Sequence, residues 1–331
     1  MKRIILAAIA LLGAATVSAQ ITEVVTATLQ QPDGSSTIYY NRTAFKQAYE
    51  AALDGAVITL SSGDFDAPER ILKKLKVYGQ GYLPDNENNV PATRVVGFLR
   101  ISSNNASDEP TSDVYLEGIR VTSSINLSEA GTKNVMIVKC RAENIQLYGI
   151  VEDITVRQST FGSIDGRGFV ANNFIVENTW VSGIKGFAAE SSVAIDHSMM
   201  NIFQSGPYYY TNCITWDYDE PEGITMYNCI VQRGNKANCT RVDCWTNFGG
   251  YSSLFTDGTD CSWGDNRTWE LADPDSFIGN DGTQIGLLGG KYPFDKIPNI
   301  PRILNSTIDT KTSEQGVLNV SISAEARPVV E

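Results

Sequence analysis

A cysteine, serine or threonine recurs at one fixed phase through the middle of this chain. The residues at this phase, termed the anchor position, are Cys140, Ser159, Thr179, Ser198, Cys213, Cys229, Cys244 and Cys261, at intervals of 15 to 20 residues. In the segments leading to the first four anchors, the residues three and five positions upstream are apolar, which is the alternation of a β-strand. A repeat this short matches one turn of a β-solenoid, whose coils stack about 4.8 Å apart.

A second apolar column supports the same architecture. It consists of Ile145, Ile164, Ile184 and Ile202, which follow the anchors by four or five residues. A β-sandwich would need antiparallel turn signals and would not predict a polar column at one phase. We therefore predict an all-β fold, a right-handed parallel β-helix built as a single-stranded β-solenoid. The residues three and five before the anchor, and the polar residue directly before it, are expected to point inward, and the residue two before it outward.

The two ends of the chain depart from the repeat. Residues 1–19 combine Lys2 and Arg3 with an apolar run and small residues up to Ala19, a pattern typical of a cleaved secretory signal peptide. Thr43 is expected to cap a helix over 44–53 that covers the first coil. The expected organisation is a β-helix domain over 20–297 with an N-terminal cap at 40–63, then a linker and small C-terminal tail over 298–331.

Several segments resemble known β-helix proteins. The stretch 45–63 (FKQAYEAALDGAVITLSSG) and the VYGQG of 77–81 resemble the entry cap of the pectin-lyase-like right-handed parallel β-helix superfamily, and the anchor motif x-Asn-Cys is similar to its repeats. The segment 280–290 (NDGTQIGLLGG) and the tail resemble those of uncharacterised secreted Bacteroidetes β-helix proteins. The resemblance covers most of residues 40–295. It implies a three-sheet helix and an association with carbohydrate.

Charge and hydropathy limit the expected cellular location of the protein and the classes of partner that it can bind. The formal net charge is −12, and phosphate binding requires clusters of Lys and Arg, so nucleic acid is not an expected partner. No segment after the leader approaches the roughly 20 apolar residues of a membrane-spanning helix, and we expect no membrane insertion. No cysteine precedes Cys140, which argues against a lipoprotein. The protein is expected to be secreted or periplasmic.

The sole histidine and the cysteines favour structural roles. His197 occupies the polar column before the anchors, which indicates a ladder residue more than a catalytic base or metal ligand. Cys213, Cys229, Cys244 and Cys261 share the anchor column, where one disulfide is geometrically feasible, and Cys239 lies outside it. Their spacing does not match the paired short motifs of structural zinc sites. We expect mostly buried thiols.

Charges line the outward position two residues before the anchor. On consecutive coils this position holds Val138, Arg157, Glu177 and Asp196, with Asp165 and Lys185 as neighbours on the second strand. Such a row is typical of a solvated, self-compensated face. The alternative is a ligand-binding face. Polysaccharide lyases with the resembled fold place calcium-binding carboxylates and a basic residue on such a face. The metal makes the α-proton of the uronate more acidic, and the base removes that proton.

An acidic insertion is the second candidate site. Residues 216–222 (WDYDEPE) leave the column after Cys213, and Arg233 has nearly the phase of Asp217 on the next coil. The candidate calcium ligands are Asp217, Asp219, Glu220 and Glu222. The candidate sugar-stacking residues are Trp216, Trp245 and Trp263. Arg233 and Asp217 are the candidate catalytic residues, and an ordinary solvated loop is the alternative.

Three functions fit this sequence. The first is a secreted or periplasmic β-helix protein that binds a polysaccharide through its outer face and turn loops. This polysaccharide is either neutral or acidic. The second is a calcium-assisted, pectate-type polysaccharide lyase, and the third is a surface adhesin or structural protein. A glycoside hydrolase is less favoured than a lyase, because no pair of opposed carboxylates at hydrolase spacing can be identified.

Overall fold

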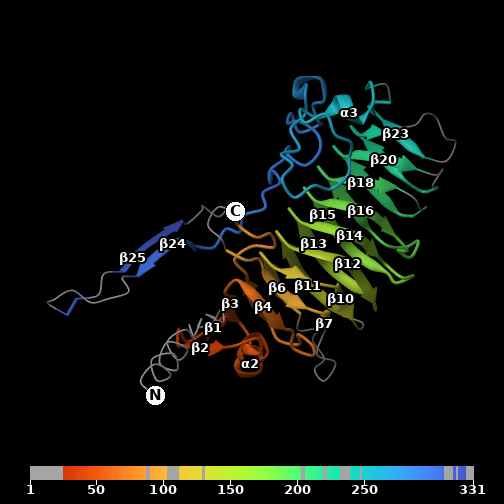
Figure 1. Cartoon of the computed structure of the whole chain (residues 1–331). Coiled ribbons are helices and arrows are strands. Elements are labelled where there is room, and N and C mark those ends of the chain that lie inside the picture. The colour runs from red at the N-terminus through yellow and green to blue at the C-terminus, as the bar shows by residue number, and fades with distance from the viewer. Residues whose placement is uncertain are drawn as a thin grey trace, which may run out of the picture.

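The computed structural model of the chain is a parallel β-solenoid (Figure 1). It describes residues 25–86, 90–102, 112–128, 131–202, 206–218, 222–231, 239–246, 248–308, 316–317 and 320–325. The predicted signal peptide lies outside these residues. No helix in the described ranges is long and apolar enough to cross a membrane.

Two large sheets form the walls of the solenoid. The first sheet contains, in spatial order, β2 (Ser36–Tyr40), β1 (Thr26–Gln30), β3 (Ala56–Leu60), β5 (Leu75–Tyr78), β8 (Val114–Glu117), β11 (Thr132–Val138), β13 (Val151–Arg157), β15 (Ala171–Glu177), β17 (Val193–Asp196), β19 (Tyr208–Thr211), β21 (Thr225–Tyr227) and β23 (Thr240–Val242). The second contains β22 (Ile230–Val231), β20 (Ile214–Tyr218), β18 (Met199–Ile202), β16 (Trp180–Lys185), β14 (Thr160–Asp165), β12 (Arg141–Tyr148), β9 (Arg120–Val121), β6 (Thr93–Val96) and β4 (Gly63–Asp66), with β7 (Leu99–Ser102) and β10 (Ser124–Ser128) beside them. The predicted parallel β-helix is confirmed.

The second sheet bends within each turn. Near the N-terminal end, one turn holds three separate strands, β8, β9 and β10, and the last two pair with the start and the end of the single strand β12. The third wall that the resemblance implied is therefore the far part of this bent sheet. Within the described residues it is not hydrogen-bonded as a sheet of its own.

The predicted core positions are buried. The residues three and five before the first four anchors are at most 1% exposed: Val135, Ile137, Ile154, Val156, Phe174, Val176, Val193 and Ile195. Ile145, Ile164 and Ile184 of the second column are equally buried. Aliphatic residues thus stack coil on coil, and their removal from water supplies the main driving force for closing the solenoid.

The anchors form a continuous hydrogen-bonded column. The Ser159 hydroxyl donates to the carbonyl of Arg157 at 2.7 Å and accepts the backbone N–H of Cys140, one coil below, at 3.0 Å. Thr179 and Ser198 repeat both contacts. The thiols of Cys213 and Cys229 donate in the same way to their own coils. Small donors are needed here because each satisfies a carbonyl at a tight turn. Cys261 is the exception, since it lies in a loop beyond the coils and not in the column.

The residue before each anchor has a left-handed backbone. The positive φ angles range from 43° to 55° at Lys139, Gln158, Asn178, His197, Asn212, Asn228 and Asp243. Asn and Asp tolerate this conformation better than other non-glycine residues. The expectation that this column points into the solenoid is wrong. Its side chains leave the turn on the outside, and those that are buried lie under a later part of the chain.

That later part is residues 279–299, here termed the strap. It runs back along the flank of the solenoid, seen as the blue trace in Figure 1, and contacts successive coils in reverse order. Asn280 bonds to Asn212, and farther along the carbonyls of Leu287 and Gly289 accept from Asn178. The ammonium of Lys139 donates hydrogen bonds to Asp295, to the Ile297 carbonyl and to Asn299. One polar residue per coil thus fastens the strap.

The ends match the predicted pattern in part. The capping helix α2 covers Ala44–Ala51, and Phe45 and Ala48 are buried. Thr43 does not cap it with its side chain, because its own backbone is already helical and its hydroxyl accepts from Gln47. Past the solenoid lie the short helix α3 (Tyr251–Leu254) and the 3-10 turn η1 (Pro274–Ser276). The tail holds an antiparallel pair, β24 (Arg302–Ile308) and β25 (Val320–Glu325).

Candidate functional site

The residues directly after Cys140 and the later anchors, continued by strand register toward the N-terminus, form an outward row on the second sheet. Strand register aligns Arg94, Arg120, Arg141, Thr160, Trp180, Met199, Ile214, Ile230 and Trp245 on consecutive coils. The next residue on each strand, such as Ala142 or Phe161, is buried in the core, so members of the row face outward. The row therefore changes from cationic at one end to apolar at the other.

The C-terminal segment covers the apolar end of this row. Met199, Ile214 and Ile230 pack with Leu254, Phe255, Trp269 and Leu271 in a second hydrophobic cluster outside the solenoid. Burial of these side chains accounts for the course of the segment. The cover ends at Arg141, which contacts Asp265 and Trp263, and a cleft remains there.

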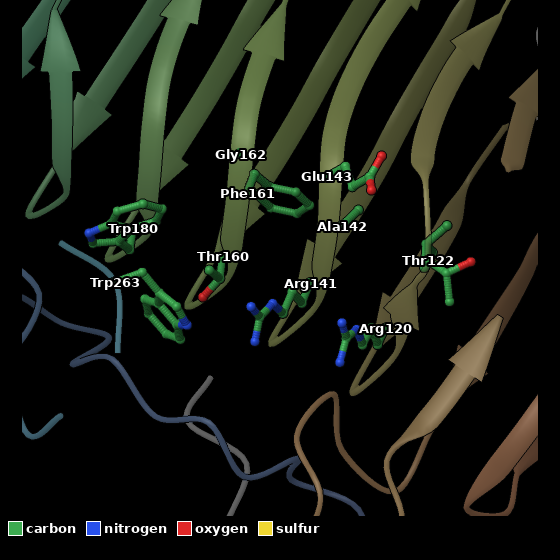
Figure 2. A pocket seen from close by; sticks show the side chains of 11 residues that line it. Arg120, Thr122, Arg141, Ala142, Glu143, Thr160, Phe161, Gly162, Trp180 and Trp263 are labelled. Atoms are coloured by element: carbon green, nitrogen blue, oxygen red, sulfur yellow. The ribbon is translucent and has the colours of Figure 1, made fainter. Parts of the chain in front are cut away.

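The cleft has a volume of about 290 Å³. It is lined by Arg120, Val121, Thr122, Arg141, Ala142, Glu143, Thr160, Phe161, Gly162, Trp180 and Trp263. Figure 2 shows the two arginines, Thr160 and Trp180 side by side at the starts of consecutive strands, with Trp263 of the C-terminal segment beside them. Glu143 lies farther along β12, and Thr122 directly follows the end of β9. One wall of the cleft is thus supplied by a loop more than 80 residues away in sequence from the rest of the lining.

The arginines differ in their partners. Arg141 Nη1 lies 2.8 Å from Asp265 Oδ1, and Arg94 Nε lies 3.4 Å from Asp64 Oδ1. Among the described residues, no carboxylate forms an ion pair with Arg120, which lies between them in the row. Burial, followed by repulsion from Arg141 and Arg94, lowers the pKa of Arg120. An arginine retains its charge at neutral pH, so Arg120 is a half-buried cation that an anion would stabilise.

Aromatic rings form the other side of the cleft. The rings of Trp180 and Trp263 have centroids 5.6 Å apart, and Trp216 stacks on Trp180 at 5.9 Å. The indole N–H of Trp180 donates to the carbonyl of Cys261 at 2.9 Å, and that of Trp263 to Asp265 Oδ1 at 2.5 Å. Both rings are half-buried and fixed in orientation. A cation beside oriented indoles can hold an anionic group attached to a flat, weakly polar body.

The predicted stacking residues divide between two places. Trp263 lines the cleft, and Trp216 supports it from behind Trp180. Trp245 does not line the cleft and packs against Phe277, with ring centroids 5.8 Å apart. The three residues therefore do not share the cleft, and a site that joins them to the acidic insertion remains a prediction, because most of that insertion lies outside the described residues.

The predicted outward charges are self-compensated. Arg157 and Glu177 form an ion pair at 2.7 Å, and the ring of Tyr292 from the strap lies 3.5 Å from the Arg157 guanidinium carbon. Asp196 Oδ2 is 3.0 Å from Nδ1 of His197. Val138, expected outside, is 3% exposed. These residues lie on the first sheet beside the strap and not in the cleft, so the reading as a compensated face fits better than a ligand site.

His197 has a structural environment. It is 1% exposed, with Nε2 3.2 Å from the Thr283 hydroxyl and 3.4 Å from Asp281. The strap crosses it at Gly289 and Gly290, where an added Cβ would come within 3 Å of the imidazole ring. Glycine is required there because the strap backbone lies directly on the ring.

The acidic insertion falls largely outside the described part of the chain. Asp219, Glu220 and Arg233 are among the residues not described, and so is the side chain of Asp217, while Glu222 is exposed. The catalytic and calcium-binding roles assigned there remain predictions. In the described ranges, no group of three or more His, Cys, Asp or Glu residues could hold a metal ion.

Cys213 and Cys229 lie on adjacent coils of the anchor column but are not bonded to each other. All six cysteines are described, and none forms a disulfide. The Cys213 backbone N–H points at the Cys229 sulfur, 3.4 Å away. Burial raises the pKa of the Cys140 thiol to about 12, which makes it a poor nucleophile.

Arg120, Arg141 and Trp180 were missed by reasoning from sequence. A signal did exist, because all three directly follow the turn on consecutive or near-consecutive coils, the phase of the outward row. Aligning the repeat one residue past the anchor would have placed Arg141 and Trp180 in one row, whereas Arg120 follows Ile119, which does not match the anchor pattern. Comparisons of the chain with protein-family models, with curated proteins and with solved structures found no significant match.

Proposed function

We propose that this protein binds an acidic glycan in the cleft between the arginine end of the outward row and Trp263. The observation that carries the proposal is Arg120, a half-buried cation with no carboxylate of the described chain as its partner, in the same cleft as two fixed indole rings. Arg141 and Thr160 lie between Arg120 and these rings along the row (Figure 2). A guanidinium offers paired N–H donors that match a carboxylate or sulfate. The indole rings farther along the cleft suit the apolar face of a neighbouring sugar ring.

The sequence supports the same function. The leader predicts export, and the resemblance to pectin-lyase-like proteins implies carbohydrate as the ligand class. The exposed Glu143 at the rim can accept hydrogen bonds from sugar hydroxyls. The binding role is preferred to the lyase and to the adhesin because the cleft supplies a receptor for an anion. The lyase hypothesis depends on the 217–222 loop, most of which lies outside the described residues.

Arg120→Gln tests the proposal. The substitution retains most of the stem and removes the charge, and a charge-assisted hydrogen bond contributes about 1.5–3 kcal/mol. We expect affinity for uronate-containing oligosaccharides, measured by titration calorimetry, to fall about 10- to 100-fold. Arg167→Gln is the control, because Arg167 stacks on Tyr148, 4.4 Å away and outside the cleft lining. Equal affinities of wild type and Arg120→Gln would refute the proposal.

The same samples separate binding from lyase activity. Incubation of acidic polysaccharides with the full chain, with and without calcium and chelator, followed by ultraviolet absorbance, would detect unsaturated product. Binding without product is the expected result. Calcium-dependent product that is lost in Asp217→Ala or Arg233→Ala would favour the lyase instead.

A further inference from the structure

We infer that the cleft selects a glycan with one isolated acidic sugar between neutral neighbours, and that Asp265 sets this selectivity. The inference rests on the proposed function and specifies the ligand class. It follows from the charges along the outward row, where three arginines on consecutive coils do not offer three equal sites.

The two outer arginines already hold carboxylates of the chain. Asp64 pairs with Arg94 at 3.4 Å, and Asp265 pairs with Arg141 at 2.8 Å. The three arginines are one coil apart, and coils of a parallel sheet repeat about every 4.8 Å. Only the middle guanidinium, that of Arg120, lacks an ion-pair partner among the described residues. The row therefore presents a single open anion position with a carboxylate on either side of it.

Asp265 is held in place by its neighbours. Its Oδ1 accepts from Arg141 Nη1 and from the indole N–H of Trp263. Its backbone carbonyl accepts from the ammonium of Lys296, which also donates to the carbonyl of Arg267 at 3.1 Å. The Asp265 carboxylate is thus an internal substitute for the acidic group that a ligand would place on Arg141.

A second acidic sugar beside the first would meet this internal carboxylate. Two like charges about 5 Å apart repel even in water, by enough to weaken binding about fourfold, and by more where water is excluded. A neutral neighbour suffers no such repulsion and can stack on Trp263 or Trp180. A fully acidic chain is therefore disfavoured relative to a chain whose acidic residues alternate with neutral ones.

Three oligosaccharide classes of equal length test the inference: neutral, alternating acidic and neutral, and fully acidic. Calorimetric titration of the full wild-type chain should give the tightest binding for the alternating class. Asp265→Asn retains the shape and an acceptor oxygen for Trp263 but removes the charge. It should raise affinity for the fully acidic class at least about fourfold and change affinity for the alternating class less than about twofold.

Two further variants guard the result. Asp257→Asn, in the same C-terminal segment but paired with Arg267 away from the cleft lining, should leave the ratio of the two affinities unchanged. Asp64→Asn, at the other end of the row, should shift the ratio in the same direction as Asp265→Asn, so a local misfolding at 265 would not hide the effect. Tightest binding of the fully acidic class by wild type, or an unchanged ratio in both Asp64→Asn and Asp265→Asn, would overturn the inference and leave the proposed function standing. Failure of wild type to bind either acidic class would refute both.

Discussion

The buried ammonium of Lys139 is the strongest polar attachment of the strap. Its side chain is 3% exposed, and Nζ bonds to Asp295 Oδ2 at 3.1 Å, to the Ile297 carbonyl at 2.7 Å and to Asn299 Oδ1 at 2.9 Å. The backbone N–H of Asn299 also donates to the buried Glu117 at 2.6 Å. Lys139→Met would keep the length and apolar stem and remove all three donors. Both residues carry a Cβ, so the cost of the positive φ at this position remains the same.

The expected loss can be worked out from this geometry. Removing one partner of a buried ion pair costs about 3–5 kcal/mol, because the remaining groups lose their compensation. The side chain of Asp295 is 33% exposed, so water can solvate part of its charge. That places the expected loss at the lower end, about 3 kcal/mol in the free energy that holds the strap to the solenoid.

Urea unfolding and amide hydrogen exchange measure this loss. Tryptophan fluorescence reports the C-terminal cover, and exchange at the amides of Ile297 and Asn299 reports the strap directly. Lys291→Met is the matched control, because Lys291 is an exposed lysine of the same strap and lies over Tyr292. We expect a change below about 0.5 kcal/mol for the control. A loss below about 1 kcal/mol for Lys139→Met would refute the view that this buried charge fastens the strap.

Three smaller predictions concern the turn columns and the C-terminal segment. Ser159→Ala should lower the free energy of unfolding by about 1–3 kcal/mol, because it strands a buried N–H and a carbonyl, whereas Ser159→Cys, like the natural anchors, should cost less in the same denaturant titration. Asn178→Gly keeps the left-handed turn but loses two bonds to the strap, so it should speed exchange of strap amides with less global destabilisation than Asn178→Ala. The Arg267 guanidinium lowers the pKa of Asp257 from 3.8 to about 2. Because the pKa of Asp257 is lower in the folded than in the unfolded state, this contact stabilises the fold fully above a pH of about 4, and the stabilisation is lost as the pH falls toward about 2. Asp257→Asn should abolish that part of the acid dependence of tryptophan fluorescence.

The solenoid could be predicted because its signals are local and repeated. Each coil carries its own apolar pair and its own anchor, so a weak pattern at Ser159 gains weight from the same pattern at Thr179 and Ser198. The anchor hydroxyl needs only a carbonyl two residues upstream and the next coil to be satisfied. Sequence period alone determines both partners.

The orientation of the polar column could not be predicted in the same way. A buried polar residue and an inward residue have the same signature in sequence, and the covering partner of Lys139 lies 156 to 160 residues away. The strap has no sequence repeat from which its path along the solenoid could be predicted. The glycine pair at 289 and 290 is the sequence feature that relates to this course. Its role is explained by the close contact of the strap backbone with His197.

The cleft depends on the same long-range cover, and its position follows from where that cover stops. The outward row is apolar from Trp180 onward, and there the C-terminal segment is held by burial of Met199 and its neighbours. Before Thr160 the row is cationic, so packing an apolar segment there would strand charge. The segment instead leaves the sheet with Trp263 and Asp265 at its edge, and Asp265 compensates the nearest arginine. Arg120, one coil farther, forms no ion pair with Asp265, whose charge raises the pKa of Arg120 less than burial, Arg141 and Arg94 lower it. The proposed anion site therefore lies where the row changes from apolar to cationic and the cover ends.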